Sequence, residues 1–203
     1  MNIKRIILTI FFSLSSLQAY IPFGEADIAK EIVLKAKEYN IDYRMLYTIV
    51  SVESDFEPLA IAVETSYHKA MVLKNLESKN IRIRTGITYH SRISLVSLYP
   101  DSYDTAVFII AKLEELGFIF DVGLMQVNTV NFTLDEVKEM LSPRENLDKA
   151  CKHLSACIGQ FKSVTHQVEC YNRGAKNLRR MLKKGKHYYP YWERYKEHWK
   201  MYF

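Results

Sequence analysis

The sequence predicts a mostly helical α+β fold that carries a small β-hairpin lobe. Two observations predict it: apolar residues recur at helical spacing in several segments, whereas residues 81–95 alternate apolar and polar side chains at period two. The chain has 203 residues, of which 48% are hydrophobic and 25% charged, as in an ordinary globular domain. Because neither a flexible linker nor an internal repeat interrupts it, we expect a single domain over residues 20–203.

Residues 1–19 have the layout of a secretory signal peptide. Lys4 and Arg5 precede an apolar run over residues 6–17, and Ala19 offers a small residue for cleavage. The run is short and rich in serine, so we expect only transient contact with the membrane during export. An uncleaved membrane anchor is the alternative interpretation.

The charge balance argues against nucleic acid as a partner. Removing residues 1–19 lowers the formal net charge from +5 to +3, and this mild positive excess suits approach to an anionic envelope polymer. Basic residues are dense only over residues 179–186, which we interpret as a solvated helix end. The three cysteines and six histidines lack metal-ligand spacing, so we expect no metal site.

Two helices are predicted before the middle of the chain. Residues 24–39 carry an apolar stripe at helical spacing and form the first helix. Asp42 is a suitable N-cap for the second helix, and Pro58 prevents that helix from continuing far.

The second helix carries the candidate catalytic residue, Glu53. At helical period Glu53 continues the apolar stripe of Leu46, Ile49 and Val50. A carboxyl group in this position is desolvated, which raises its pKa and suits a general acid. The alternative is a structural carboxylate that pairs with an Arg or Lys at the edge of the core.

Residues 59–120 form an enlarged middle segment, and their pattern is the least clear of the chain. The predicted elements are a helix over residues 67–76, two strands joined by a turn at His90–Arg92, and a helix over residues 102–116 that Gly117 ends.

The remaining third of the chain is predicted to be helical after one turn. Asp121 to Asn128 is interpreted as a turn followed by a short half-buried segment. One predicted helix begins at a Thr133–Glu136 capping box and ends at Leu141, and the next runs from Ser142–Pro143 to about Phe161. A further short helix ends at Tyr171–Gly174, and a last helix lies within residues 187–203.

One disulfide is a candidate, between Cys157 and Cys170. Cys151 and Cys157 share a predicted helix, where six residues of rise separate their Cα atoms by about 9 Å, beyond bridging distance. Cys157 and Cys170 lie equally far from a turn near Ser163 and Val164, so antiparallel helices would bring them level. Three buried thiols are the alternative.

Three motifs in this order resemble the soluble lytic transglycosylase (SLT) family, whose fold is lysozyme-like, of the goose type. They are Glu53-Ser54 at a helix end with Phe56 and Pro58 behind it, Gly123-Leu124-Met125-Gln126 followed by Val127-Asn128, and Tyr171-Asn172 with Gly174, preceded by a helix that opens at Asn146-Leu147. The resemblance covers roughly residues 26–182. The form of residues 121–128 looks most like the small members that are associated with type IV secretion and pilus assembly systems.

The resemblance implies cleavage of the β-1,4 bond between N-acetylmuramic acid and N-acetylglucosamine in peptidoglycan. Glu53 would protonate the glycosidic oxygen and then take the proton of the muramoyl C6 hydroxyl, which leaves a 1,6-anhydro end. No cofactor is implied. The implied location is the periplasm, and the implied partners are glycan strands and components of a secretion or pilus apparatus.

Five further residues would contact the substrate by the same resemblance. Gln126 and Asn172 would bond to sugar acetamido groups, and Tyr171 would orient either an acetamido group or the Glu53 carboxyl. Met125 would form a wall of the saccharide groove. Ser54 completes the set, although a hydrogen bond at the helix end is its simpler role.

Two alternatives to the lyase remain open. In a hydrolytic muramidase Asp121 would activate a water opposite Glu53, with the two carboxyls about 6.5–9.5 Å apart. Asp121 is more simply explained as a turn residue. The second alternative is an inactive peptidoglycan-binding assembly factor, because Phe118 to Asp121 replace the small residues usual in the family.

Overall fold

The computed structural model describes residues 24–87 and 93–203. The expected signal peptide, residues 1–19, and the expected hairpin turn at His90–Arg92 lie outside the described residues. Within the described part, no helix is long and apolar enough to cross a membrane.

The described residues form a helical domain with a small antiparallel sheet, which confirms the predicted fold class. The helices are α1 (Glu25–Glu38), α2 (Tyr43–Ser54), α3 (Tyr67–Lys74), α4 (Tyr103–Glu115), α5 (Val137–Met140), α6 (Pro143–Gln160), α7 (Val164–Arg173), α8 (Ala175–Lys183) and α9 (Pro190–Tyr202). The strands are β1 (Ile61–Ser66), β2 (Ile81–Ile87), β3 (Ile93–Pro100), β4 (Asp121–Val122) and β5 (Val127–Asn128). Two short 3-10 turns cover Thr129–Asn131 and Leu134–Glu136.

The predicted hairpin is confirmed, but it is only part of the sheet. β2 and β3 pair antiparallel, and the strand order is β2-β3-β1-β4-β5. The sequence pattern missed β1, the middle strand, because only Ile61 and Val63 mark its buried face. It missed β4 because this two-residue strand pairs with β1, far earlier in the chain. It missed β5 because this strand, equally short, pairs only with β4 across the turn between them.

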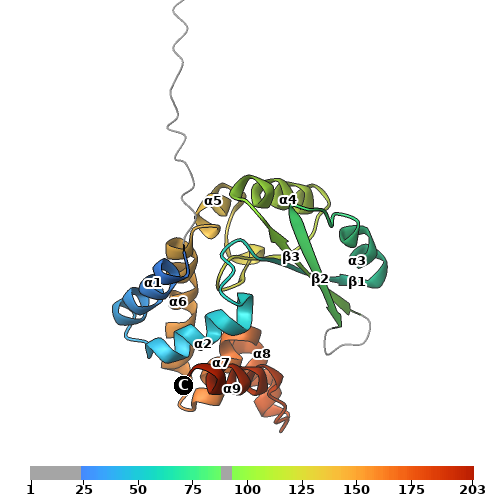
Figure 1. Cartoon of the computed structure of the whole chain (residues 1–203). Coiled ribbons are helices and arrows are strands. Elements are labelled where there is room, and N and C mark those ends of the chain that lie inside the picture. Colours follow the sequence, from blue (N-terminus) through green and yellow to red (C-terminus); the bar gives the residue numbers. More distant parts are fainter. Residues whose placement is uncertain (1–23, 88–92) are drawn as a thin grey trace, which may run out of the picture.

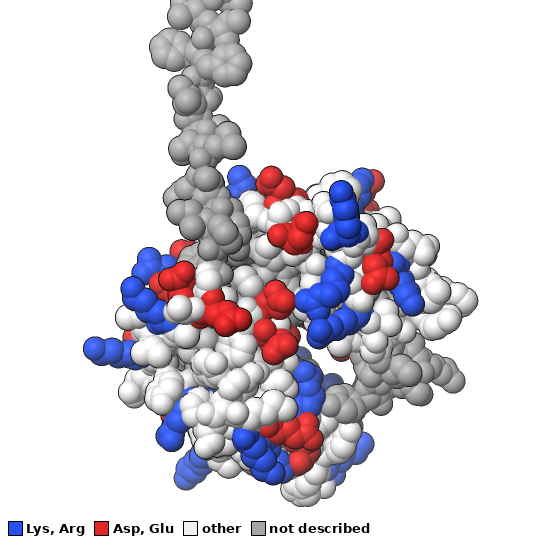
Figure 2. Space-filling model, viewed as in Figure 1, with Lys and Arg blue, Asp and Glu red and all other residues white. Residues whose placement is uncertain are grey.

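The two faces of the sheet differ in burial. Val63 and Val96 face one another across β1 and β3 and are fully buried, and α3 and α4 pack on this side (Figure 1). The opposite face carries half-exposed residues such as Ala62 and Ser97. On that side the space-filling view shows a hollow between the sheet and the lower helices (Figure 2). The sheet is therefore covered on one face and open on the other.

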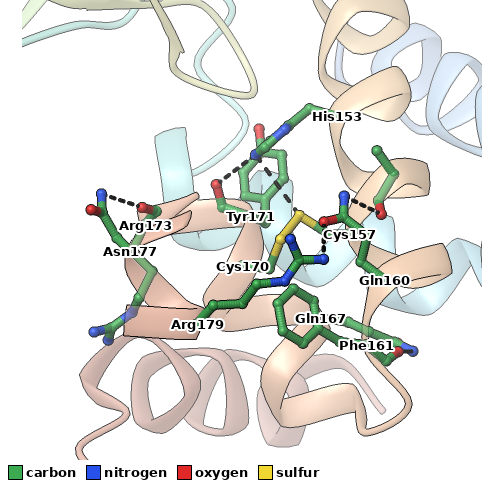
Figure 3. Close-up of a disulfide and its surroundings, with 11 residues drawn as sticks. His153, Cys157, Gln160, Phe161, Gln167, Cys170, Tyr171, Arg173, Asn177 and Arg179 are labelled. Carbon is green, nitrogen blue, oxygen red and sulfur yellow. Dashed lines mark hydrogen bonds between the residues drawn. A yellow bond between two sulfur atoms is a disulfide. The ribbon is translucent and has the colours of Figure 1, made fainter. Parts of the chain in front are cut away.

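A disulfide between Cys157 and Cys170 joins α6 to α7 (Figure 3). The cysteines expected to pair are thus bridged, and Cys151 is a free, buried thiol. Leu178 of α8 packs on the disulfide and forms a second small core with it. The predicted helix end at Gly174, which has φ 77°, is confirmed, but no separate helix was predicted where α8 lies.

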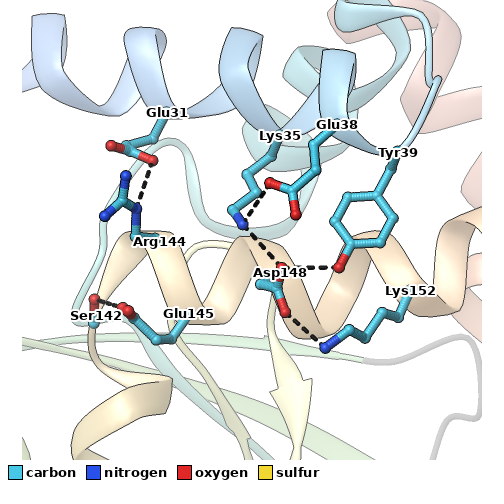
Figure 4. Close-up of polar contacts among 9 residues, drawn as sticks. All are labelled: Glu31, Lys35, Glu38, Tyr39, Ser142, Arg144, Glu145, Asp148 and Lys152. Atoms are coloured by element: carbon cyan, nitrogen blue, oxygen red, sulfur yellow. Dashed lines mark hydrogen bonds and ion pairs between the residues drawn. The ribbon is translucent and has the colours of Figure 1, made fainter.

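Ion pairs and hydrogen bonds connect α1 to α6 (Figure 4). The Nζ of Lys35 lies 2.9 Å from Asp148 Oδ1, and the hydroxyl of Tyr39 donates to the same oxygen at 2.8 Å. Burial would raise the pKa of Asp148, but the hydrogen bonds from Lys152, Lys35 and Tyr39 outweigh it and hold that pKa well below its ordinary value. This contact fixes α1, which in turn packs against α2.

We predict that replacing both Cys157 and Cys170 with Ala lowers the free energy of unfolding by about 3 kcal/mol, because the unfolded chain loses a loop constraint of this length. Urea denaturation of the oxidised protein and the variant would measure it. A reductant should lower the stability of the wild type to that of the variant and leave the variant unchanged; an equal effect of reductant on both would contradict the prediction.

Candidate active site

Glu53 lies in the last turn of α2, where the chain reverses. At the start of α2, Asp42 accepts a hydrogen bond from the backbone N–H of Arg44, as predicted for an N-cap. At its end, Asp55 and Phe56 have φ values of 55° and 63°, in the left-handed region that side chains rarely adopt. This strained reversal turns the chain toward β1 immediately after Glu53.

The apolar stripe below Glu53 is buried as the sequence predicts. Leu46, Ile49 and Val50 have no exposed surface. Glu53 lies on the same face of α2, at its end, and is half-buried. The hydroxyl of Tyr191, in α9, donates a hydrogen bond of 2.5 Å to Glu53 Oε1. Arg194, one turn further along α9, donates to the backbone carbonyl of Val52 at 2.8 Å. The C-terminal helix therefore closes over the carboxyl group.

Burial raises the pKa of Glu53 to about 7. The hydrogen bond from Tyr191 and the positive charge of Arg194 oppose the shift, and the negative charge of Asp121 adds to it. The alternative of a carboxylate paired with Arg or Lys does not describe this site, because its hydrogen-bond donor is a phenol. A carboxyl group with this pKa is partly protonated near neutral pH and can donate a proton.

Asp121 is a strand residue rather than the turn residue that the sequence indicated. It belongs to β4, where it pairs with Ala62 of β1 and Asn128 of β5. The side-chain amide of Asn128 donates to its carboxylate at 2.7 Å. Burial raises the pKa of Asp121 to about 6; the bond from Asn128 opposes this shift and the charge of Glu64 adds to it. Two carboxyl groups with raised pKa values thus face the same region.

A buried amide, that of Asn146, fixes the turn after β4. Its Nδ2 donates to the carbonyls of Val122 and Met140 at 2.8 and 2.9 Å, and its Oδ1 accepts the N–H of Met125 at 2.9 Å. Gly123 has φ 80°, and a Cβ there would stand 2.4 Å from Asn146 Nδ2. Only glycine fits at this position.

Three of the expected substrate-binding residues have structural roles instead. Met125 is fully buried in the core, so its side chain does not form a wall of a groove. Gln126 has φ 47°, and its amide nitrogen donates to the carbonyls of Ala60 and Gly123, so it holds the turn and leaves only its carbonyl oxygen for a ligand. Ser54 is buried and donates to the carbonyl of Val50, the simpler of its two expected roles.

Tyr171 and Asn172 occupy the last turn of α7. The hydroxyl of Tyr171 donates to the Met125 carbonyl at 2.7 Å. Tyr171 was expected to orient either Glu53 or an acetamido group, but the phenol that bonds to Glu53 is that of Tyr191. Burial, and then the nearby charge of Glu53, raises the pKa of Tyr171 well above its ordinary value, so it remains neutral. Asn172, the next residue, is exposed. Of the two residues, Asn172 is therefore the one whose side chain can reach a ligand.

Tyr191 is the residue of the candidate site that the sequence did not reveal. The tail was predicted to form a helix that packs back on the domain, and α9 does so, with Tyr191 and Tyr195 almost fully buried. The spacing of Tyr191, Tyr195 and His198 indicates the buried face. It does not indicate that this face meets the end of α2.

No metal-binding cluster is found in residues 24–87 and 93–203, where no three His, Cys, Asp or Glu side chains are grouped to hold an ion. A helical domain in which a desolvated glutamic acid faces the open side of a small antiparallel sheet is a lysozyme-like arrangement.

The family model of the transglycosylase SLT domain matches residues 31–191, and the chain belongs to this family. The match spans the whole site, from α1 to Tyr191. No curated protein and no solved structure matches the chain.

We predict that Glu53→Gln stabilises the protein more at pH 8 than at pH 5. The folded-state pKa of Glu53, about 7, lies above its ordinary value of 4.5, so the wild type loses stability as pH rises between these values, whereas glutamine does not. At about 1.4 kcal/mol per pKa unit, the gain in the free energy of unfolding should be roughly 2 kcal/mol larger at pH 8.

Urea denaturation at the two pH values would measure this gain, with Glu77→Gln as the control for an exposed glutamate. The same gain at both pH values would show that Glu53 is not desolvated.

Proposed function

We propose that the protein is a peptidoglycan lytic transglycosylase that produces 1,6-anhydromuramoyl ends. The observation that carries the proposal is the Glu53 carboxyl, which is desolvated, has a pKa near 7 and is held by Tyr191. Membership of the SLT family supports peptidoglycan as the substrate. An inactive assembly factor would have no need for a carboxyl group that burial keeps protonated.

In the proposed reaction Glu53 acts twice. Tyr191 holds Oε1, which leaves Oε2 for the proton that passes to the glycosidic oxygen as the bond to the muramoyl C1 breaks. The carboxylate formed then accepts the proton of the muramoyl C6 hydroxyl, whose oxygen bonds to C1. Microscopic reversibility allows one residue to serve in both steps, and Glu53 ends protonated as it began.

Asp121 supports a second candidate, the hydrolytic muramidase. Its charge acts on Glu53 and its own pKa, about 6, leaves it mostly ionised at neutral pH, as a base that activates water must be. Its carboxylate is, however, already bonded to Asn128. We favour the lyase because the substrate's C6 hydroxyl makes a second catalytic carboxylate unnecessary.

The proposal includes a place of action in the periplasm. It is supported by the signal-peptide pattern of residues 1–19 and by the resemblance of residues 121–128 to members associated with secretion and pilus systems. There the enzyme would open the wall locally for such an apparatus. Detection of the protein in a periplasmic fraction, with an amino terminus near Tyr20, is the expected result.

We predict that Glu53→Gln reduces release of soluble muropeptides from purified sacculi by at least about 10²-fold, because general acid–base catalysis is lost. Mass spectrometry of the wild-type products should show anhydro ends. Asp121→Asn is the matched variant: it should retain turnover in the lyase and lose it in the hydrolase. Reducing ends, together with an inactive Asp121→Asn, would establish the muramidase instead.

We predict that Tyr191→Phe moves the alkaline limb of kcat/KM to higher pH. The variant lacks the hydrogen bond that favours the charged form of Glu53, so the pKa of the carboxyl rises. A pH profile would measure the shift, with Tyr195→Phe as a control on the same buried face of α9. A limb that moved to lower pH would contradict the role assigned to Tyr191.

A further inference from the structure

The open face of the sheet carries a continuous row of side chains that ends near Glu53. Cross-strand pairing aligns Arg84 of β2 with Ser97 of β3, Ser97 with Ala62 of β1, and Ala62 with Asp121 of β4. Cross-strand partners lie on the same face of a sheet, so these four residues share one side. Asp121 ends this row on the β4 side, and its charge adds to the raised pKa of Glu53.

Two arginines and a tyrosine are held together at the far end of this face. Arg82 lies opposite Tyr99 in the register, and its guanidinium carbon is 4.1 Å from the centre of the Tyr99 ring. The guanidinium carbon of Arg84 is 5.3 Å from the same ring. Such cation–π contacts hold both guanidinium groups in place without using their N–H donors.

A pocket of about 650 Å³ adjoins this group. Arg82 and Tyr99 line it together with Lys79 and the loop that follows α2, from Glu57 to Leu59. Figure 2 shows Lys and Arg side chains gathered beside the hollow between the sheet and the lower helices. The pocket is therefore positively charged on its β2 side and begins only four residues after Glu53.

Within residues 24–87 and 93–203, only one of the two guanidinium groups, that of Arg82, forms an ion pair. Arg82 forms an ion pair of 3.0 Å with Glu57, in which both side chains are nearly half exposed, and such pairs contribute little to stability. Asp101, the other acid of the pocket, accepts a hydrogen bond from Thr105. Among the residues that the structure describes, no carboxylate lies within ion-pair distance of Arg84. An incoming carboxylate can therefore bind Arg84 and replace Glu57 on Arg82.

The length of the row matches the substrate of the proposed function, on which this inference rests. Arg84 lies three strands from Asp121, about 14 Å at the usual strand spacing. In the proposed reaction the muramoyl unit lies at Glu53, and in peptidoglycan this sugar carries a short peptide with free carboxylates. An extended peptide advances about 3.3 Å per residue, so four residues span the row.

We propose that the open face of the sheet binds this stem peptide, and that Arg82 and Arg84 bind one of its carboxylates. The enzyme would then recognise glycan strands that carry peptides and discriminate against strands from which peptides have been removed. A charged edge strand also prevents pairing with other chains, but that role does not require two guanidinium groups on one ring.

Binding to the Glu53→Gln protein tests the inference without turnover. The probes are the disaccharide N-acetylglucosaminyl–N-acetylmuramic acid with its tetrapeptide and the same disaccharide without peptide, measured by calorimetry. Arg82→Gln with Arg84→Gln should weaken binding of the first probe at least about tenfold, as expected for lost charge-assisted hydrogen bonds, and leave the second unchanged. The matched control, Lys69→Gln with Lys112→Gln, removes the same charge from α3 and α4 on the covered side and should change neither.

Other results would overturn the inference. If the double arginine variant bound both probes equally more weakly, the arginines would only shape the groove. If it bound both as tightly as before, the arginines would only prevent the edge strand from pairing with other chains. The proposed function is judged separately, by muropeptide release from sacculi with Glu53 intact. If release persists unchanged in the double arginine variant and is equal on peptide-free glycan, the function stands and the peptide-binding site does not.

Discussion

Burial of one carboxyl group between α2 and α9 is the constraint on which the rest of the site depends. The hydrogen bond between Tyr191 and Glu53 joins residues 138 positions apart, so the environment of Glu53 is complete only when the last helix has docked. Desolvating an acid is unfavourable, and so is the left-handed backbone at Asp55 and Phe56 that follows it. Both are sustained by the fully buried stripe of α2 and by the packing of α9.

A second constraint is the rigid turn that faces the carboxyl group. Asn146 binds three backbone groups of this region, Gln126 binds two, and Tyr171 binds the Met125 carbonyl. Gln126 and Tyr171 were expected to bind the substrate, but the donors of all three side chains bond to backbone carbonyls. A turn built in this way cannot shift without breaking several buried hydrogen bonds, so it keeps Asp121 and Tyr171 at fixed positions beside Glu53.

The sequence predicted the features that depend on residues close together in the chain and missed those that depend on distant ones. Helices such as α2 and α6 were predicted with their starts because caps and apolar periodicity are local, and the position of Glu53 followed from the same pattern. β1 and β4 are stabilised by partners far along the chain, which no local pattern encodes. β5 pairs only with β4, and two residues are too few to show a period. The role of Gln126 depends on its left-handed backbone, and that of Tyr191 on where α9 docks; neither can be derived from residue type and spacing.

The sheet affects the acidity of Glu53 as well as the shape of the site. Burial raises the pKa of both carboxyl groups, to about 6 for Asp121 and to about 7 for Glu53. The charge of Asp121 adds to the shift of Glu53 and disfavours ionisation of that carboxyl group. Because Asp121 is positioned by its pairing with β1 and β5, the strands that follow Glu53 in the chain help to set the acidity of this residue.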